Sequence, residues 1–259
     1  MKQPKYRDAL PQLSDTLFVT DGGLETVLVF QRGIDLPDFA SFPLLTTDEG
    51  TQHLLEYYKD YIDIARQNRC GMIVDTATWR ASRGWGEKLG FDADDILRVN
   101  RHGVKILESV RELHETPESP MVINGVIGPQ DDGYQPSQLL DADEAEAYHR
   151  HQVDAFADSA ADMVTAVTMT YVDEAVGIVR AAQNAGLPVA VSFTVETDGR
   201  LPDETPLADA IQAVDAATGS APCYYMINCA HPDHFSQVLA AAGSWKDRVY
   251  GARANASRK

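Results

Sequence analysis

Apolar and polar positions follow two different rhythms along this chain. Short, continuous apolar runs rich in valine and isoleucine are typical of strands buried on both faces, and the longer segments between them repeat their apolar residues at helical spacing. The pattern predicts seven strands, at residues 17–20, 72–75, 121–126, 163–168, 188–194, 224–228 and 249–252. A strand followed by a helix is therefore the repeating unit.

The segments between the predicted strands have the apolar stripe of amphipathic helices. One helix carries its stripe at Leu54, Tyr58, Tyr61, Ile62 and Ala65, and the next at Ile96, Val99, Gly103, Ile106, Val110 and Leu113. Thr46 with Glu49 fits a capping box at the start of the first of these helices. Thr205 followed by Pro206 fits an N-cap with proline in the first turn of a later helix.

Repeated strand and helix units imply a parallel sheet covered by helices, either open or closed into a barrel. An open nucleotide-binding sheet usually has GxGxxG after its first strand, whereas the turn here reads TDGGLET. We therefore predict an α/β fold of the (β/α)8 TIM-barrel type, with one domain covering residues 1–259. Because a barrel of this type closes with eight strands, the chain is expected to be truncated before the eighth.

Composition narrows the class of protein. The 259 residues include 39 acidic and 22 basic side chains, for a net charge of −17, which disfavours nucleic acid and anionic lipid as partners. No apolar stretch is long enough to span a bilayer, and the first residues lack the apolar core of a secretory signal, so a cytoplasmic protein is expected. Three scattered cysteines argue against a disulfide framework.

In a parallel barrel the chemistry gathers at the carboxyl ends of the strands. In strand order these ends carry Asp21, Gly22, Gly23 and Glu25; Thr76, Thr78 and Trp79; Asn124, Gly125 and Gly128; Thr168, Thr170 and Tyr171; Ser192, Thr194 and Glu196; Asn228 and Cys229; Arg253 and Asn255. This set is polar and contains one soft metal ligand, Cys229. Packing alone would also explain a lone cysteine there, and the two glycines could simply serve a tight turn with positive φ.

Five segments, in order along the chain, resemble motifs of the homocysteine S-methyltransferase family. They are VTDGGLET, DTATWRAS, INGVIGP, VSFTVETDGRLPDETPLADAI and INCAHP, which resemble the family's DGG turn, TxTYxAS, GSxGP, SFT with DGTPL, and NC signatures. Members of this family transfer a methyl group to the sulfur of homocysteine on a (β/α)8 barrel. The resemblance covers essentially the whole chain and implies a methyltransferase that acts on a small-molecule thiol and a methyl donor in methionine biosynthesis.

The resemblance also implies a zinc site. Family members hold zinc with three thiolates and leave the fourth position to the homocysteine sulfur, which the metal keeps deprotonated. Cys229 matches one thiolate, whereas the GGCC motif that carries the other two is absent from this sequence. Cys70 and Cys223 are expected at the opposite end of the strands. The implied substrate pocket comprises Asp21, Gly22, Gly23, Glu25, Thr76, Trp79, Thr168, Tyr171, Asn228 and Asn255.

The fourth strand departs from the family pattern. Many members have a glutamate there that holds the amino group of homocysteine, but this chain has Val167 and Thr168 in that neighbourhood. Asp21 or Glu196 could replace it, or the substrate is another thiol. For a sulfonium or quaternary ammonium methyl donor, Trp79 and Tyr171 are the candidate aromatic contacts.

Other interpretations stay open on the sequence alone. A replacement metal site of Cys229, His231 and His234 is disfavoured, because His231 and Pro232 predict a helix start. The chain could be a non-catalytic barrel that binds a small ligand without metal. It could also be another barrel enzyme that uses carboxylates such as Asp21 or Glu196. Unpaired edges on the first and last strands would favour self-association into a homo-oligomer.

Overall fold

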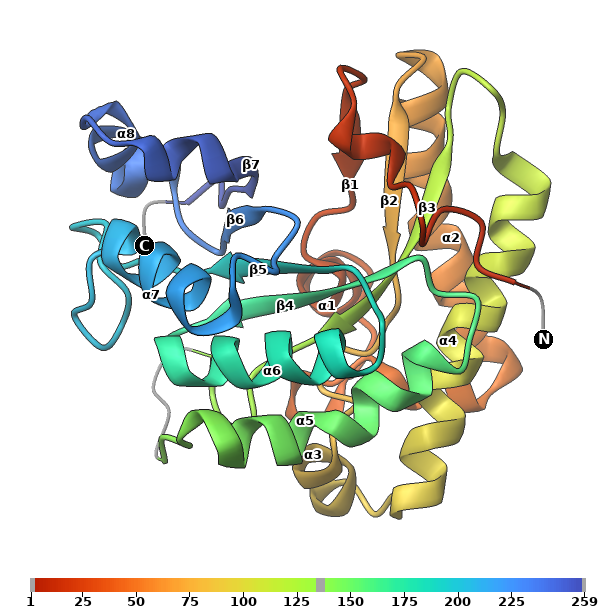
Figure 1. Cartoon of the computed structure of the whole chain (residues 1–259). Helices are drawn as coiled ribbons and strands as arrows, with labels where there is room; N and C mark the ends of the chain where they lie inside the picture. Colours follow the sequence, from red (N-terminus) through yellow and green to blue (C-terminus); the bar gives the residue numbers. More distant parts are fainter. Residues whose placement is uncertain (1–2, 134–137, 258–259) are drawn as a thin grey trace. The chain divides into compact units, whose positions relative to one another are not determined.

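The computed structural model describes residues 3–133 and 138–257. The chain divides into two compact units, one formed by residues 1–127 and 154–164 and the other by residues 128–153 and 165–259. Figure 1 shows the elements of both units in the colours of the sequence. Whether the two units behave as the single domain expected from the sequence stays a prediction.

Seven strands occur in the described residues, and they follow one another across the sheet in chain order from β1 to β7. Their bounds are β1 Phe18–Thr20, β2 Gly71–Asp75, β3 Met121–Ile127, β4 Met163–Met169, β5 Val189–Phe193, β6 Tyr225–Asn228 and β7 Val249–Arg253. The register of neighbouring strands is parallel, as in the pairs of β1 with β2, β2 with β3, β5 with β6 and β6 with β7. This order confirms the predicted TIM-barrel class, with seven strands among the residues that the structure describes.

The first unit places its long helices against β2 and β3. Its helical elements are η1 Pro11–Leu13, α1 Leu24–Thr26, η2 Val27–Gln31, η3 Pro37–Phe39, η4 Phe42–Thr46, α2 Asp48–Gln67, α3 Arg83–Lys88 and α4 Ala93–His114. The helix α2 packs on β2 and α4 packs on β3, and both strands are buried along their whole length. The predicted stripe of α4 is correct except at Leu113, which is 78% exposed because it lies in the last turn, at the edge of the stripe.

The second unit continues the same alternation. Its helical elements are α5 Ala142–Ala157, whose last turn belongs to the first unit, α6 Val172–Asn184, α7 Leu207–Thr218, α8 Pro232–Ala240 and η5 Ser244–Arg248. Figure 1 shows α6 running alongside β4 and β5. The strands β5 and β6 are buried throughout, whereas β7 alternates between half-buried and exposed positions, and Tyr250 on it is 60% exposed.

Two helix starts lie one residue later than the sequence predicts. The N-cap of α2 is Thr47, whose hydroxyl accepts a hydrogen bond from the Gly50 amide, because the Thr46 hydroxyl instead donates to the Pro43 carbonyl of the preceding turn. The N-cap of α7 is Pro206 and not Thr205, since Thr205 belongs to a turn closed by its carbonyl and the Leu201 amide. Both corrections reflect local hydrogen bonds that compete for the predicted cap.

A buried carboxylate, Asp162, holds the first unit together just before β4. One of its oxygens accepts hydrogen bonds from the Lys5 and Tyr6 amides at 2.8 and 2.7 Å. The other accepts from the Arg111 guanidinium at 2.6 Å and from the Ile123 amide at 2.8 Å. Asp162 is fully buried, and its charge is stabilised by these donors and by the nearby charge of Arg7. The N-terminal segment, α4 and β3 are therefore joined by one side chain.

Removing this carboxylate should destabilise the protein strongly. Asp162→Ala leaves the Arg111 guanidinium buried without its partner, which typically costs about 3–5 kcal/mol of unfolding free energy. The matched control is Asp158→Ala, which removes a solvent-exposed pair with Arg101 and should cost at most about 1 kcal/mol. Urea unfolding followed by circular dichroism measures both. Equal losses for the two variants would contradict the role assigned to Asp162.

Candidate functional site

The turn after β1 is shaped by a close contact. Asp21 is buried, and its carbonyl accepts a hydrogen bond from the Thr20 hydroxyl at 2.9 Å. Gly22 and Gly23 are exposed, and neither has the positive φ that a tight turn would have required. A Cβ atom at Gly22 would lie 2.7 Å from the Tyr61 hydroxyl. Glycine is required there because α2 approaches the turn closely.

Carboxylates gather near the ends of β1 and β2. Glu25 accepts a hydrogen bond from the Ser41 hydroxyl at 2.6 Å, and although part of the residue is exposed, burial of its carboxyl group raises its pKa. Asp75, the last residue of β2, is buried and accepts from the Asn124 amide at 2.7 Å. The sequence analysis did not select Asp75, although an acidic residue at the end of an apolar run was a visible signal.

Tyr58 of α2 lies among these carboxylates. Its hydroxyl donates to the Asp75 carbonyl at 2.8 Å, and the side chain is 2% exposed. Burial, and then the nearby charges of Asp21, Asp75 and Glu25, raise its pKa well above the usual value. Tyr58 therefore stays protonated as a hydrogen-bond donor. Its role depends on tertiary packing and had no signal in the sequence beyond its place on a helical stripe.

The threonines after β2 bind the neighbouring strand. The Thr76 and Thr78 hydroxyls lie 2.5 Å apart, the Val126 amide donates to Thr76 at 3.0 Å, and Thr78 donates to the Val126 carbonyl at 2.8 Å. Both threonines are buried, so these hydroxyls join β2 to β3. The half-buried Trp79 ring lies 4.8 Å from the Arg80 guanidinium, a cation that already occupies a position suited to cation–π attraction.

In the second unit, one amide connects three strand ends. The Asn228 Oδ1 atom accepts from the Thr168 amide at 3.0 Å and from the Ser192 hydroxyl at 2.6 Å, and its Nδ2 atom donates to the Thr168 hydroxyl at 2.8 Å. All three residues are at most 2% exposed. Thr168 lies in the left-handed region, with φ of 65°, which is strained for a β-branched residue. These contacts fix the ends of β4, β5 and β6.

Cys229 follows this cluster directly. It is half-buried, has a φ of 55°, and its amide donates to the Arg253 carbonyl of β7 at 3.1 Å. The exposed Asn255 lies just beyond β7, and its amide donates to the Ala230 carbonyl at 2.9 Å. A left-handed, non-glycine residue at a strand end is a place where backbone strain is held by its surroundings. The strand end thus presents the thiol in a fixed backbone conformation.

The other strand-end residues of the second unit have mainly structural partners. The Tyr171 hydroxyl accepts from the Leu140 amide at 3.1 Å, and burial raises its pKa. Next to it the sequence analysis missed a fully buried pair, in which the His149 ring lies 2.9 Å from Glu174. Glu174 also accepts from the Gln130 amide at 2.6 Å. Two residues far apart in the sequence gave no motif that could have revealed this pair.

The residues present do not fit a three-thiolate metal site. Cys70 is buried just before β2, and Cys223 lies just before β6, so each is at the amino end of its strand, as expected. The His231 ring accepts from the Asp233 amide at 3.1 Å as the N-cap of α8, the role expected for a helix start. Among residues 3–133 and 138–257, no group of three or more histidine, cysteine or acidic side chains is placed to hold a metal ion.

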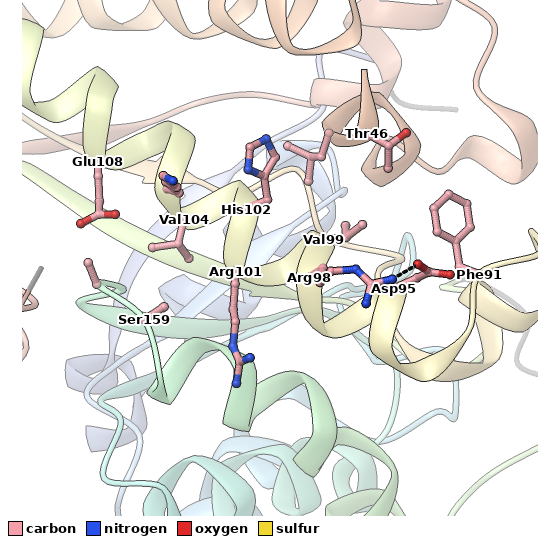
Figure 2. Close-up of a pocket in the computed structure, with 13 residues that line it drawn as sticks. Thr46, Phe91, Asp95, Arg98, Val99, Arg101, His102, Val104, Glu108 and Ser159 are labelled. Carbon is pink, nitrogen blue, oxygen red and sulfur yellow. Dashed lines mark hydrogen bonds and ion pairs between the residues drawn. The ribbon is translucent and has the colours of Figure 1, made fainter. Parts of the chain in front are cut away.

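A separate cavity of 490 Å³ lies along the outer side of α4 in the first unit (Figure 2). Leu45, Phe91 and Val99 line it, and Figure 2 shows Arg101 and His102 pointing in opposite directions from the helix. A Cβ atom at Gly103 would instead meet Thr76 and Thr78 at 3.4–3.5 Å. The inner face of α4 therefore contacts the end of β2, and the cavity is distinct from the strand-end residues.

The predicted site residues thus fall into two groups. Asp21, Gly22, Gly23, Glu25, Thr76 and Trp79 belong to the first unit, and Thr168, Tyr171, Asn228, Cys229 and Asn255 belong to the second. Within the first group, Gly22 contacts α2 and Thr76 bonds β3. Within the second group, Asn228 binds Thr168 directly and immediately precedes Cys229. Their role in substrate binding stays a prediction.

Solved structures with a similar fold are methyltransferases. The metallated form of the homocysteine methyltransferase MmuM from Escherichia coli has a TM-score of 0.73 at 17% identity, with 95% of this chain and 93% of that chain covered. Its oxidized form has a TM-score of 0.74 at 20% identity, with 97% and 95% covered. At these identities the likeness establishes the fold. The comparison with curated proteins gave no match.

A parallel βα chain of this order, with polar residues and a thiol at its strand ends, defines a protein of the TIM-barrel class. The family model of homocysteine S-methyltransferases matches residues 18–259. The chain belongs to the homocysteine S-methyltransferase family, and this membership makes it a methyltransferase-like enzyme. No helix among the described residues is long and apolar enough to cross a membrane.

The contact between the first turn and α2 can be tested directly. Gly22→Ala should lower the unfolding free energy by about 1–2 kcal/mol, because the new methyl group would press on the Tyr61 hydroxyl. Tyr61→Phe removes that oxygen, so the same glycine substitution should cost clearly less in the Tyr61→Phe background. Denaturant unfolding of the four proteins of this cycle provides the measurement. An equal cost in both backgrounds would show that the hydroxyl does not impose the glycine.

Proposed function

We propose that this chain transfers a methyl group to the sulfur of homocysteine or a similar small thiol. The sulfur, as thiolate, would attack the methyl carbon. The bond from that carbon to the donor heteroatom breaks with its electron pair staying on the donor, and the thiol proton is lost to solvent. Family membership supports the reaction class. The donor is expected to be a sulfonium or quaternary ammonium compound.

Cys229 is the observation that carries this proposal. It combines a place at the carboxyl end of a barrel strand, partial exposure and a left-handed backbone, with the buried Asn228 immediately before it. Catalytic residues in this fold class come from these strand ends. Glu196, which follows β5 in the same unit as Cys229 and is exposed, is the proposed partner for the ammonium group of an amino-acid thiol, since the fourth strand offers no carboxylate.

Zinc is the metal that a site built from cysteine thiolates favours. Cys229 is the residue of this chain proposed to bind it. The described residues place one thiolate at the strand ends, so they do not fit the three-thiolate site on their own. No step of the proposed reaction is therefore assigned to a metal. The role proposed for the strand-end residues of this chain is to hold the thiol substrate.

Replacing the strand-end thiol should abolish the reaction. Cys229→Ala is expected to lower homocysteine methylation at least about 100-fold while the circular dichroism spectrum stays unchanged, since one half-buried side chain is shortened by a single atom. The matched control is Cys223→Ala at the other end of β6, which should keep activity within about twofold. Product formation is measured by mass spectrometry with a panel of sulfonium and quaternary ammonium donors. Full activity of Cys229→Ala would remove Cys229 from the mechanism.

Metal content tests the donor set independently of activity. The purified 259-residue chain should retain well below one zinc ion per chain after dialysis. A single cysteine, which belongs to no group of three potential metal ligands among the described residues, binds zinc far less tightly than a thiolate cluster. Inductively coupled plasma mass spectrometry on the wild type and on Cys229→Ala gives the answer. Stoichiometric zinc that survives dialysis in the wild type would contradict this expectation.

A second candidate function is binding of a small thiol without catalysis, and the incomplete donor set favours it. In that case the wild-type chain would bind homocysteine in calorimetry, and Cys229→Ala would leave that binding nearly unchanged. Binding without any methylated product, across the whole donor panel, would favour this function over methyl transfer.

A further inference from the structure

We infer that Asn228 is a positioning residue that holds the strained backbone of Thr168, and not a residue that itself contacts the substrate. This inference rests on the proposed function, because it concerns how the same strand ends are kept in place. The sequence assigns Asn228 to the substrate pocket by resemblance alone. The contacts of its amide argue for a different role.

The hydrogen-bonding capacity of the Asn228 amide is almost entirely used by the protein. Its oxygen has two lone pairs and accepts from the Thr168 amide and the Ser192 hydroxyl, and one of its two N–H groups donates to the Thr168 hydroxyl. The side chain is 2% exposed. A substrate atom could bond at most the one remaining N–H group. Three of the four hydrogen-bonding positions of the amide are therefore used within the protein.

Two of the three bonds stabilise Thr168, whose backbone conformation is strained. Thr168 has a φ of 65°, and a left-handed backbone is strained in a β-branched residue and persists only where the surrounding structure holds it. Asn228 bonds both the amide and the hydroxyl of this residue, which closes a ring of hydrogen bonds between β4 and β6. The ring explains how a threonine can keep a conformation that glycine would adopt without strain.

We call the hydrogen bonds of Asn228 to Thr168 and Ser192 the Asn228 clamp. This clamp also fixes the direction in which the chain leaves β6. Asn228 is the last residue of β6 and pairs with Arg253 of β7, and Cys229 follows in the left-handed region with its amide on the Arg253 carbonyl. The hydrogen bonds of the Asn228 side chain to β4 and β5 restrict the rotation of the backbone at the end of β6. The backbone conformation of Cys229 is therefore fixed by contacts with β4 and β5 on one side of β6 and with β7 on the other.

The test is a double-mutant cycle in unfolding between Asn228→Ala and Thr168→Gly. In the wild type, Thr168→Gly removes the hydroxyl that accepts the hydrogen bond from the Asn228 amide, and this loss should lower the folded-to-unfolded ratio. In the Asn228→Ala background that bond is already lost, so Thr168→Gly relieves strain and should raise the ratio about 3- to 10-fold. The change of sign is the expected result, and the same effect in both backgrounds would overturn the inference.

Glu204 supplies a matched control. It also has a left-handed backbone, with φ of 69°, but it is exposed in the loop before α7, where its backbone groups bond Leu201 and Arg200. Glu204→Gly should therefore change the folded-to-unfolded ratio by the same factor in the wild type and in Asn228→Ala. If Asn228→Ala does not give folded protein, Asn228→Ser, whose short side chain cannot reach β4, takes its place in the cycle.

Kinetics separate positioning from direct contact. If Asn228 acts through Thr168, Asn228→Ala, Thr168→Gly and the double variant should lower kcat to a similar degree, at least about tenfold, with KM within about twofold of the wild type. Losses that multiply in the double variant, or a rise in KM alone, would mean that Asn228 contacts the substrate and would overturn the inference. A wild-type chain without methyltransferase activity would overturn the proposed function only. The unfolding cycle would then show by itself whether Asn228 holds the backbone of Thr168.

Discussion

The ends of the buried parallel strands impose one constraint on this protein, namely that a polar group left there without a partner costs free energy. In the first unit, the Thr76 and Thr78 hydroxyls meet this demand by bonding the backbone of β3 at Val126. In the second, the Asn228 amide meets it by bonding Thr168 and Ser192. An unmade bond at such a place would cost about 1–3 kcal/mol. The cross-strand bonds therefore hold the strand ends of each unit in place.

This constraint divides the polar strand-end residues into two kinds. Those whose hydrogen-bonding groups are used within the protein, such as Thr78 and Asn228, fix the geometry of the strand ends. Those that keep some exposure, such as Cys229, remain able to meet a ligand. A position in a family motif does not distinguish the two kinds, because both are polar residues at the end of an apolar run. The distinction follows from counting partners for each side chain.

The seven strands could be predicted to within about two residues because continuous apolar runs in a parallel sheet are a strong, local signal. The helix caps at Thr46 and Thr205 were one residue off because neighbouring groups, such as the Pro43 carbonyl, competed for the same hydrogen bonds. The pair of His149 with Glu174 and the bond of Tyr58 to Asp75 were missed, since these contacts join residues distant in the sequence. Periodicity reports which face is buried and not which side chains meet there.

Cys229 lies at the end of β6 in a conformation that its neighbours impose. A left-handed cysteine next to a buried asparagine is an unfavourable local conformation, and it persists because β4, β5 and β7 all hold the end of β6. A cysteine that served only as a small apolar residue would need no such conformation, since it could pack equally well within the strand. The strain therefore supports a role for the position of this thiol, and that role does not depend on which further ligands complete a site around it.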